Sequence, residues 1–215
     1  MNKINYQKEL EKVIEQNQRQ GKIPKLLLHV CCAPCSSYCL EYLSQFFDIT
    51  VYYYNPNISI KEEYEYRLSE EKRYISLKEF KHPVKLTDSR YDPSMFFTAV
   101  KGLENEPEGG LRCRECFRLR LEASAKKAKE QGFDYFTTTL TISPLKNATL
   151  LNEIGAEMGE RYGISWLYSD FKKREGYKRS IELSREFDLY RQNYCGCIFS
   201  RREAEQRNKA SDSVQ

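Results

Sequence analysis

Short apolar runs alternate along this chain with longer stretches in which apolar residues recur at helical spacing. The runs are typical of buried parallel strands, and they cover 25–30, 48–54, 84–86, 134–141 and 164–168. The longer stretches predict helices over 5–20, from Pro34 onward, over 59–80, near 93–100, from Arg112 to Gly132 and over 147–162. Five such alternations predict a single-domain α/β protein whose doubly wound sheet is mostly parallel.

The same pattern predicts where a ligand lies. In an open parallel sheet, ligands bind beyond the carboxyl ends of the strands. Cys31 and Cys32 directly follow the run 25–30, and the segments around Ser143 and Asp170 leave later strands at the same edge. We therefore expect the site at this edge, within a catalytic domain over 25–207 that follows a helix and lead-in over 1–24. The polar tail 208–215 is expected to be disordered.

Cysteines supply the candidate chemistry. Seven of the eight fall into three tight clusters, namely Cys31, Cys32 and Cys35, then Cys113 and Cys116, then Cys195 and Cys197. Unrelated core thiols have no reason to occur in pairs, so this spacing indicates a metal or redox centre. The second cluster reaches the same edge if the glycine-containing loop 101–111 folds back. The start of the following helix also favours thiolates.

The metal is a choice among alternatives. Zinc held by four cysteines usually takes two CxxC pairs, whereas Cys113 and Cys116 are here matched with the adjacent Cys31 and Cys32. Iron–sulfur clusters accept more varied spacings, so the pattern favours iron–sulfur over zinc. Thiol chemistry without a metal stays a third alternative.

The pair Cys195 and Cys197 has a different character. A disulfide between them would close a very small ring, and strain makes such a bond comparatively oxidising. The spacing therefore favours a two-electron redox relay over a structural disulfide, with a role as metal ligands as the alternative.

Compartment and charge narrow the function further. The first 20 residues contain no apolar signal segment, and no run of 18 apolar residues is present, so we expect a cytoplasmic protein without a membrane span. The net charge is +4, and seven basic side chains against two acidic ones lie between 112 and 129. Further basic stretches lie at 172–179 and 201–207. This distribution indicates either a polyanionic substrate or an ordinary solvated face.

Five motifs in order resemble the QueH family of cobalamin-independent epoxyqueuosine reductases. They are HVCCAPCS at 29–36, YNPN at 54–57, RCREC at 112–116, ISPLKN at 142–147 and LYRQNYCGC at 189–197. The resemblance implies reduction of epoxyqueuosine to queuosine in the wobble position of tRNA, the last step of queuosine biosynthesis. It also implies a [4Fe-4S] cluster, no cobalamin, and a Rossmann-like fold related to the nucleotide-binding (HUP) domains of tRNA-thiolating enzymes.

The resemblance also implies roles for the cysteines. Cys31, Cys32, Cys113 and Cys116 resemble the cluster ligands, and Cys195 with Cys197 resembles the redox-active pair. Cys35 is expected either to replace one cluster ligand or to hold an additional iron. Cys39, one helical turn further on, is expected to be a packing thiol.

The reaction needs two electrons, two protons and an electrophile for the epoxide oxygen. The dithiol stores an electron pair, and an open iron site polarises the oxygen. Candidate proton donors are His29, which we favour as a core residue, and Tyr54, Tyr194 and Asp170. Arg114, Arg118, Arg120 and Tyr194 are expected to contact tRNA, and the external electron donor is not identified. The alternatives are an iron–sulfur tRNA thiolation enzyme and a zinc-stabilised RNA-binding module.

Overall fold

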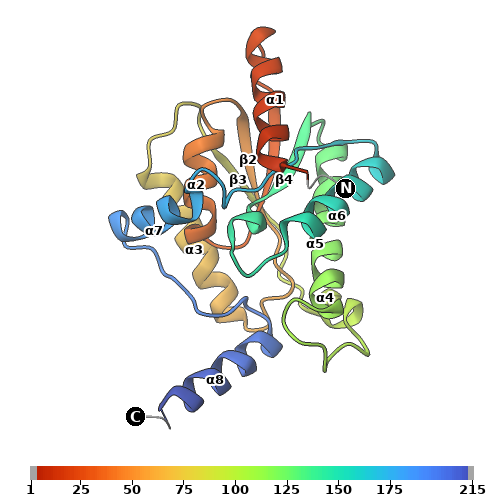
Figure 1. The fold of residues 1–215 in the computed structure, drawn as a ribbon, viewed down its shortest axis with the longest axis vertical. Helices are drawn as coiled ribbons and strands as arrows, with labels where there is room; N and C mark the ends of the chain where they lie inside the picture. The colour runs from red at the N-terminus through yellow and green to blue at the C-terminus, as the bar shows by residue number, and fades with distance from the viewer. Residues whose placement is uncertain (1–3, 213–215) are drawn as a thin grey trace.

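The computed structural model describes residues 4–212, with side chains described as far as 208. Five strands form one sheet in the order β3-β2-β1-β4-β5, and every pairing between them is parallel (Figure 1). The strands are β1 (Lys25–Val30), β2 (Asp48–Tyr53), β3 (Lys85–Asp88), β4 (Tyr135–Thr138) and β5 (Ser165–Trp166). The predicted α/β class with a parallel sheet is confirmed.

Helices cover both faces of this sheet (Figure 1). They are α1 (Tyr6–Arg19), α2 (Ala33–Leu43), α3 (Lys61–Leu77), α4 (Ser94–Ala99), α5 (Leu111–Glu130), α6 (Ala148–Tyr162), α7 (Gly176–Glu186) and α8 (Ile198–Asp212). Leu26, Leu28 and Val30 of β1 share a core with α1, α2 and α3. Leu27 points to the other face and packs with α5 and α6. Successive residues of a strand face opposite sides, so β1 contributes to both cores.

Local signals explain where several helices begin and end. The Asn5 side chain accepts a hydrogen bond from Lys8 N, and the Asn147 side chain accepts one from Leu150 N. These caps satisfy amide groups that a helix start leaves free. Gly163 ends α6 with a φ of 64°, a left-handed conformation that suits glycine.

The structure corrects some predicted boundaries. The run 134–141 divides into β4 and a 3₁₀ turn, η1 (Thr139–Ile142). The strand ends because the Thr138 hydroxyl accepts a hydrogen bond from Leu140 N at 3.2 Å, which turns the backbone. The last strand is confined to Ser165–Trp166, inside the predicted 164–168.

Two helices follow the last strand, where the periodicity indicated no element. α7 packs against α2, and α8 lies at the end of the molecule opposite α1 (Figure 1). α8 covers 208–212 of the tail that we expected to be disordered, and residues 213–215 lie outside the described part. No helix in the described residues is both long enough and apolar enough to span a membrane.

Glu71 of α3 is fully buried beside α2, the helix whose first turn carries Cys35. Ser36 Oγ donates a hydrogen bond to its Oε2 at 2.7 Å, while its Oε1 has no partner. Burial raises the pKa of Glu71 to about 8, which outweighs the opposing effect of the Ser36 hydrogen bond. The carboxyl is therefore protonated in the folded protein at neutral pH.

This burial predicts a pH dependence of stability. The folded protein binds the Glu71 proton more tightly than the unfolded chain does, so the stabilisation is complete below the unfolded pKa and is lost as pH rises through about 8. Glu71→Gln cannot ionise at this position. We therefore expect its free energy of unfolding, relative to that of the wild type, to rise by roughly 4 kcal/mol from pH 5 to pH 9. Denaturant unfolding of both proteins at each pH measures this difference.

A matched control lies on the same helix. The side chain of Glu65 is 61% exposed, so Glu65→Gln is expected to follow the wild type at every pH. A constant difference between Glu71→Gln and the wild type across the pH range would contradict the assignment.

Candidate active site

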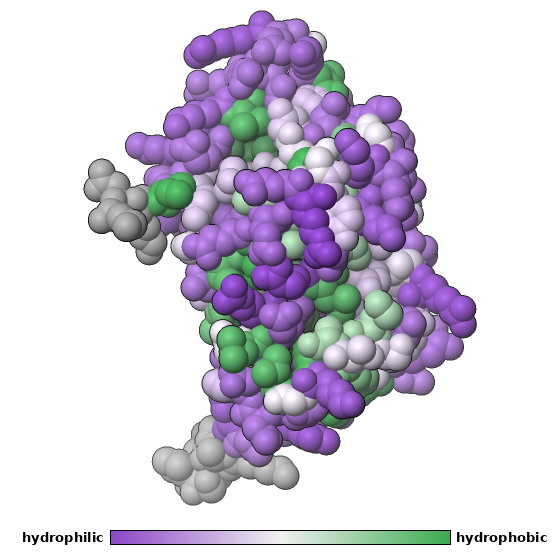
Figure 2. All heavy atoms as spheres, turned by 90° about the vertical axis from the view of Figure 1, so that its right-hand side faces the viewer, coloured by the Kyte–Doolittle hydropathy of each residue, from purple (hydrophilic) through white to green (hydrophobic). Residues whose placement is uncertain are grey.

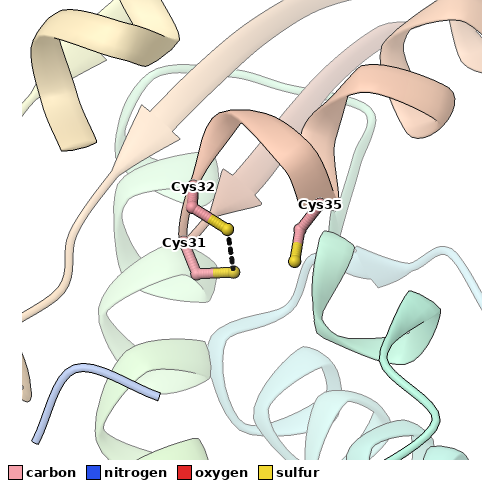
Figure 3. Close-up of side chains that lie close together, drawn as sticks. All are labelled: Cys31, Cys32 and Cys35. Carbon is pink, nitrogen blue, oxygen red and sulfur yellow. Dashed lines mark hydrogen bonds between the residues drawn. The ribbon is translucent and has the colours of Figure 1, made fainter. Parts of the chain in front are cut away.

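The first cysteine cluster lies where β1 ends and α2 begins. Cys31 and Cys32 follow the strand, and Cys35 lies in the first turn of the helix, which starts at Ala33 with a proline in its first turn. The three Sγ atoms lie within 4.8 Å of one another, and those of Cys31 and Cys32 are 3.8 Å apart (Figure 3). Their sulfurs point into one space, so this group could hold a metal ion.

The three thiols share their protons unequally. Hydrogen bonds from Cys32 and then Cys35 lower the pKa of Cys31 well below its usual value, although burial opposes this. The same interaction with Cys31 raises the pKa of Cys32 to about 12 and raises that of Cys35 as well. One thiolate is thus stabilised by two S–H donors, which is the state in which sulfur binds a metal.

The other two clusters also lie at helix starts. Cys113 is in the first turn of α5, and its sulfur accepts a hydrogen bond from Gly109 N at 3.2 Å. Cys197 immediately precedes α8, and its sulfur accepts one from Ser200 N at 3.4 Å. Three helix amino termini, each with a positive dipole end, therefore carry cysteines.

Packing and charge bring the three clusters to one region. Cys116 and Cys197 share an apolar cluster with Phe96. Cys31 and Cys113 both pack against the core that Leu27 forms with α5 and α6. The pKa of Cys116 is raised to about 12, mainly by burial; Arg120 opposes the rise, and the nearby Cys195 and Cys197 add to it. Cys113 and Cys116 nevertheless lie outside the tight group of Cys31, Cys32 and Cys35.

A cavity of about 320 Å³ opens beside the clusters. Its lining includes cysteines, cations, aromatic rings and amides, namely Cys31, Cys32, Cys35, Cys195, Arg67, Lys146, Arg191, Tyr177, Tyr194, Gln192 and Asn193. Lys146 stays charged there: burial alone would lower the pKa of Lys146, but the Cys195, Cys31 and Cys35 thiols outweigh it and raise the pKa. The cavity combines sulfur chemistry with positive charge and stacking surfaces.

Arg67 of α3 holds the third cluster in place. Its side chain is buried; it pairs with Glu63 at 2.7 Å and donates from Nη1 to Cys195 O at 3.3 Å. It also lies 5.2 Å from the centre of the Tyr194 ring. Gly196 is required in this turn because its φ is 115° and an added Cβ would lie 2.9 Å from Ile58.

Arg112 connects the second and third clusters. Its guanidinium donates to the carbonyl oxygens of Glu104 and Glu106 in the loop before α5. It also pairs with Glu203 of α8 at 2.9 Å and lies 4.6 Å from the Phe199 ring centre. Arg112 therefore fixes the start of α5 against the helix that follows the Cys195–Cys197 turn.

His29 is a core residue, as favoured from the sequence. Its ring is fully buried, with Nδ1 2.8 Å from Thr138 Oγ1 and Nε2 3.0 Å from Tyr54 O. Burial, together with the charge of Arg120, lowers the pKa of His29 to about 4, so the ring is neutral at pH 7. Cys39 is likewise fully buried, as expected of a packing thiol. Tyr194 is the candidate proton donor that lines the cavity; the described lining does not include His29, Tyr54 or Asp170.

The three arginines expected to contact tRNA lie in different environments. Arg114 is exposed, and Arg118 is partly exposed and pairs with Glu157 and, at 3.9 Å, with Glu115. Arg120 corrects the expectation: its side chain is fully buried and cannot lie on an RNA-binding surface. Arg120 lies seven residues after Cys113 and four after Cys116, which places it on the same face of α5 as these cysteines. This spacing could have indicated its burial, but counting basic residues treated it like the exposed arginines.

Sequence reasoning gave no role to Arg67, Lys146 or Arg191, which line the cavity. Lys146 and Arg191 fall inside the motifs 142–147 and 189–197, which could have indicated them. Arg67 lies in a helix with a charged residue in almost every turn, so nothing in its local sequence separates it from solvent-facing neighbours.

A family model described as epoxyqueuosine reductase QueH matches residues 26–203. The chain is 48% identical over 204 residues to the epoxyqueuosine reductase QueH of Staphylococcus epidermidis, covering 92% of this chain and 85% of that protein. It is 46% identical to that of Streptococcus pyogenes, covering 92% and 78%. It is 36% identical to that of Thermotoga maritima, covering 81% and 89%.

Proposed function

This chain belongs to the epoxyqueuosine reductase QueH family, and we propose that it reduces epoxyqueuosine to queuosine in the wobble position of tRNA as the last step of queuosine biosynthesis. It is an oxidoreductase that processes tRNA, and the comparisons favour this function over tRNA thiolation or a zinc-stabilised RNA-binding module. The observation that carries the proposal is that cysteines of the first and third clusters line one cavity, while the second cluster packs in the same apolar clusters as Cys31 and Cys197.

The donor set supports a [4Fe-4S] cluster held by Cys31, Cys32, Cys113 and Cys116. Thiolates are the ligands that iron–sulfur clusters take. Arg120 is buried nearby with Nη1 and Nη2 unpartnered, which favours an anionic group at this position. When bound, such a cluster would supply single electrons, and an iron with an open coordination position, such as the additional iron proposed at Cys35, would polarise the epoxide oxygen.

Cys35 is proposed as the ligand of an additional iron or as an alternative cluster ligand. Its sulfur belongs to the tight group with Cys31 and Cys32, whereas Cys39 on the same helix is in the core (Figure 3). Its first-turn position in α2 directs the thiol toward the other two sulfurs.

Cys195 and Cys197 are proposed to supply the electron pair. Their two S–H bonds break, an S–S bond forms, and two electrons and two protons pass to the epoxide. Both carbon–oxygen bonds break, a carbon–carbon double bond forms and the oxygen leaves as water, so the exchange balances. Cys195 lines the cavity, and Cys197 is buried behind it with Ser200 Oγ 3.5 Å from its sulfur.

The cavity is proposed to hold the modified nucleoside. Its volume of about 320 Å³ is in the range of small-molecule sites. Tyr177 and Tyr194 offer ring faces for stacking, and Lys146 and Arg191 offer positive charge for phosphate. Tyr194 is also the proposed proton donor nearest the redox pair in sequence.

The tRNA body is proposed to bind next to this cavity, on the exposed part of α5. Hydrophilic side chains cover most of the face on the right-hand side of Figure 1, with apolar areas toward its lower half (Figure 2). Arg114 is exposed on α5, and Arg118 is partly exposed. We further propose a cytoplasmic enzyme that needs no cobalamin and whose dithiol is restored by an external electron donor.

The metal assignment predicts the effect of removing its ligands. Cys113→Ser and Cys116→Ser should each lose most bound iron and sulfide and all reductase activity, because serine is a poor ligand at neutral pH. Iron and sulfide assays on anaerobically purified protein measure this. Cys39→Ser is the matched control and should keep both, and Cys35→Ser should lose part of the iron. Full iron in both the Cys113 and Cys116 variants would refute the assignment.

The redox pair predicts a single turnover without added reductant. Pre-reduced wild type mixed with epoxyqueuosine-tRNA should form about one queuosine per protein and finish with the pair oxidised. Cys197→Ser should keep its iron yet form none, because one thiol cannot close an intramolecular disulfide. Mass spectrometry of the alkylated protein and an iron assay on the same sample measure both. A variant that keeps iron and turnover would exclude this role.

The RNA surface predicts a change in salt dependence. Arg114→Ala should weaken tRNA binding and reduce the slope of log affinity against log salt by about 1, as expected for one lost phosphate contact. Arg118→Ala should have a smaller effect because Arg118 already pairs with Glu157. The control is Arg19→Ala, because Arg19 lies six residues before Lys25, where β1 begins at the opposite end of the sheet. If Arg114→Ala binds tRNA as tightly as the wild type at every salt concentration, Arg114 does not contact phosphate and is an ordinary solvated side chain.

A further inference from the structure

Arg120 is the one guanidinium in the described chain that is fully buried and leaves both Nη atoms without a hydrogen-bond partner. Its Nε donates to Cys116 O at 3.2 Å, one turn earlier in α5. Its guanidinium carbon lies 5.6 Å from the centre of the Phe117 ring. The backbone and this ring fix the position of the guanidinium, while its two outer nitrogens are left to donate elsewhere.

The other buried arginines have carboxylate partners. Arg67 pairs with Glu63 at 2.7 Å, and Arg112 pairs with Glu203 at 2.9 Å. Among the described residues, Arg120 makes no ion pair with a carboxylate. A buried charge without a partner is costly, so the folded protein must offer Arg120 another source of negative charge.

Cysteines of the site lie on the same face of α5 as Arg120. Cys116 is four residues before Arg120 and Cys113 is seven residues before it, so the three side chains share one face of the helix. Cys197 joins the same apolar cluster as Cys116. His29 is neutral and Lys146 is a cation, so neither compensates the charge of Arg120. Sulfur is therefore the acceptor that this face of α5 offers.

We propose that Arg120 is a positioning residue for the redox centre, whose Nη groups donate hydrogen bonds to sulfur at the metal site and whose fixed charge raises the reduction potential of that site. This inference depends on the proposed function. Hydrogen bonds to sulfur and nearby charge are the protein's means of setting such potentials. A positive charge favours the form that carries one more electron.

The test is a potentiometric titration of the reconstituted enzyme, followed by the paramagnetic signal of the reduced centre. Arg120→Met and Arg120→Gln both remove the charge, and each should shift the one-electron reduction equilibrium at least tenfold, which corresponds to a potential 59 mV lower. Arg120→Lys keeps the charge and should recover most of the difference. Arg161→Met removes an arginine of α6 whose side chain is 60% exposed, and it should leave the potential unchanged.

Metal content separates failure of this inference from failure of the proposed function. Wild-type protein that binds no iron and sulfide would refute the iron–sulfur centre itself. With the centre loaded, an unchanged potential in the neutral variants, or a lysine variant as low as the methionine variant, would refute the role of Arg120 alone.

Metal-free protein distinguishes positioning from a purely structural role. Arg120 has no carboxylate partner, so its neutral variants leave no unpaired carboxylate and should fold as stably as the wild type without metal. Neutral variants that fold without metal but cannot load iron would support the proposal, since the centre then needs this charge. Neutral variants that fail to fold without metal would show that Arg120 is structural and would refute it.

Discussion

Buried positive charge at the carboxyl edge of the sheet is the constraint on which the site depends. Three arginines are buried there: Arg67 pairs with Glu63, Arg112 pairs with Glu203, and Arg120, which has no carboxylate partner in the described chain, is proposed to donate to sulfur. A guanidinium cannot lose its charge under ordinary conditions, so the surrounding chain must supply acceptors. The Arg112–Glu203 pair joins α5 to α8, and Arg67, whose partner Glu63 lies one turn away in α3, joins that helix to the Cys195 turn. The charge that the site needs also holds its parts together.

The parallel sheet makes this concentration possible. All five strands point their carboxyl ends the same way, so the segments that follow them, and the helix starts they lead into, meet at one edge. Three cysteine clusters lie at the amino termini of α2, α5 and α8, where free amides and dipoles favour thiolate. Sulfur, helix dipoles and guanidinium charge therefore act in the same direction, toward an anionic occupant.

Two titratable side chains near the site are held in their neutral forms. His29 and Glu71 lie close to the first cysteine cluster, yet burial keeps the histidine unprotonated and the glutamate protonated at neutral pH. Neither adds charge to the site. The electrostatics at the cavity are therefore set by the thiols, Lys146, the arginines and Glu108 of its lining, while Glu63 and Glu203 pair with Arg67 and Arg112.

Local sequence determined much of this protein: β1 and β2, most helix positions, and the grouping of seven cysteines into three clusters, because apolar periodicity and residue spacing are local properties. It did not indicate α7, which is short and mostly polar, or α8, whose apolar period is weak. Only the tertiary structure decided which arginine of α5 faces solvent, since Arg114 and Arg120 belong to one basic run and differ in what packs against them. Tertiary contacts likewise decided that Arg67 is buried under Cys195, because burial depends on partners 128 residues away along the chain.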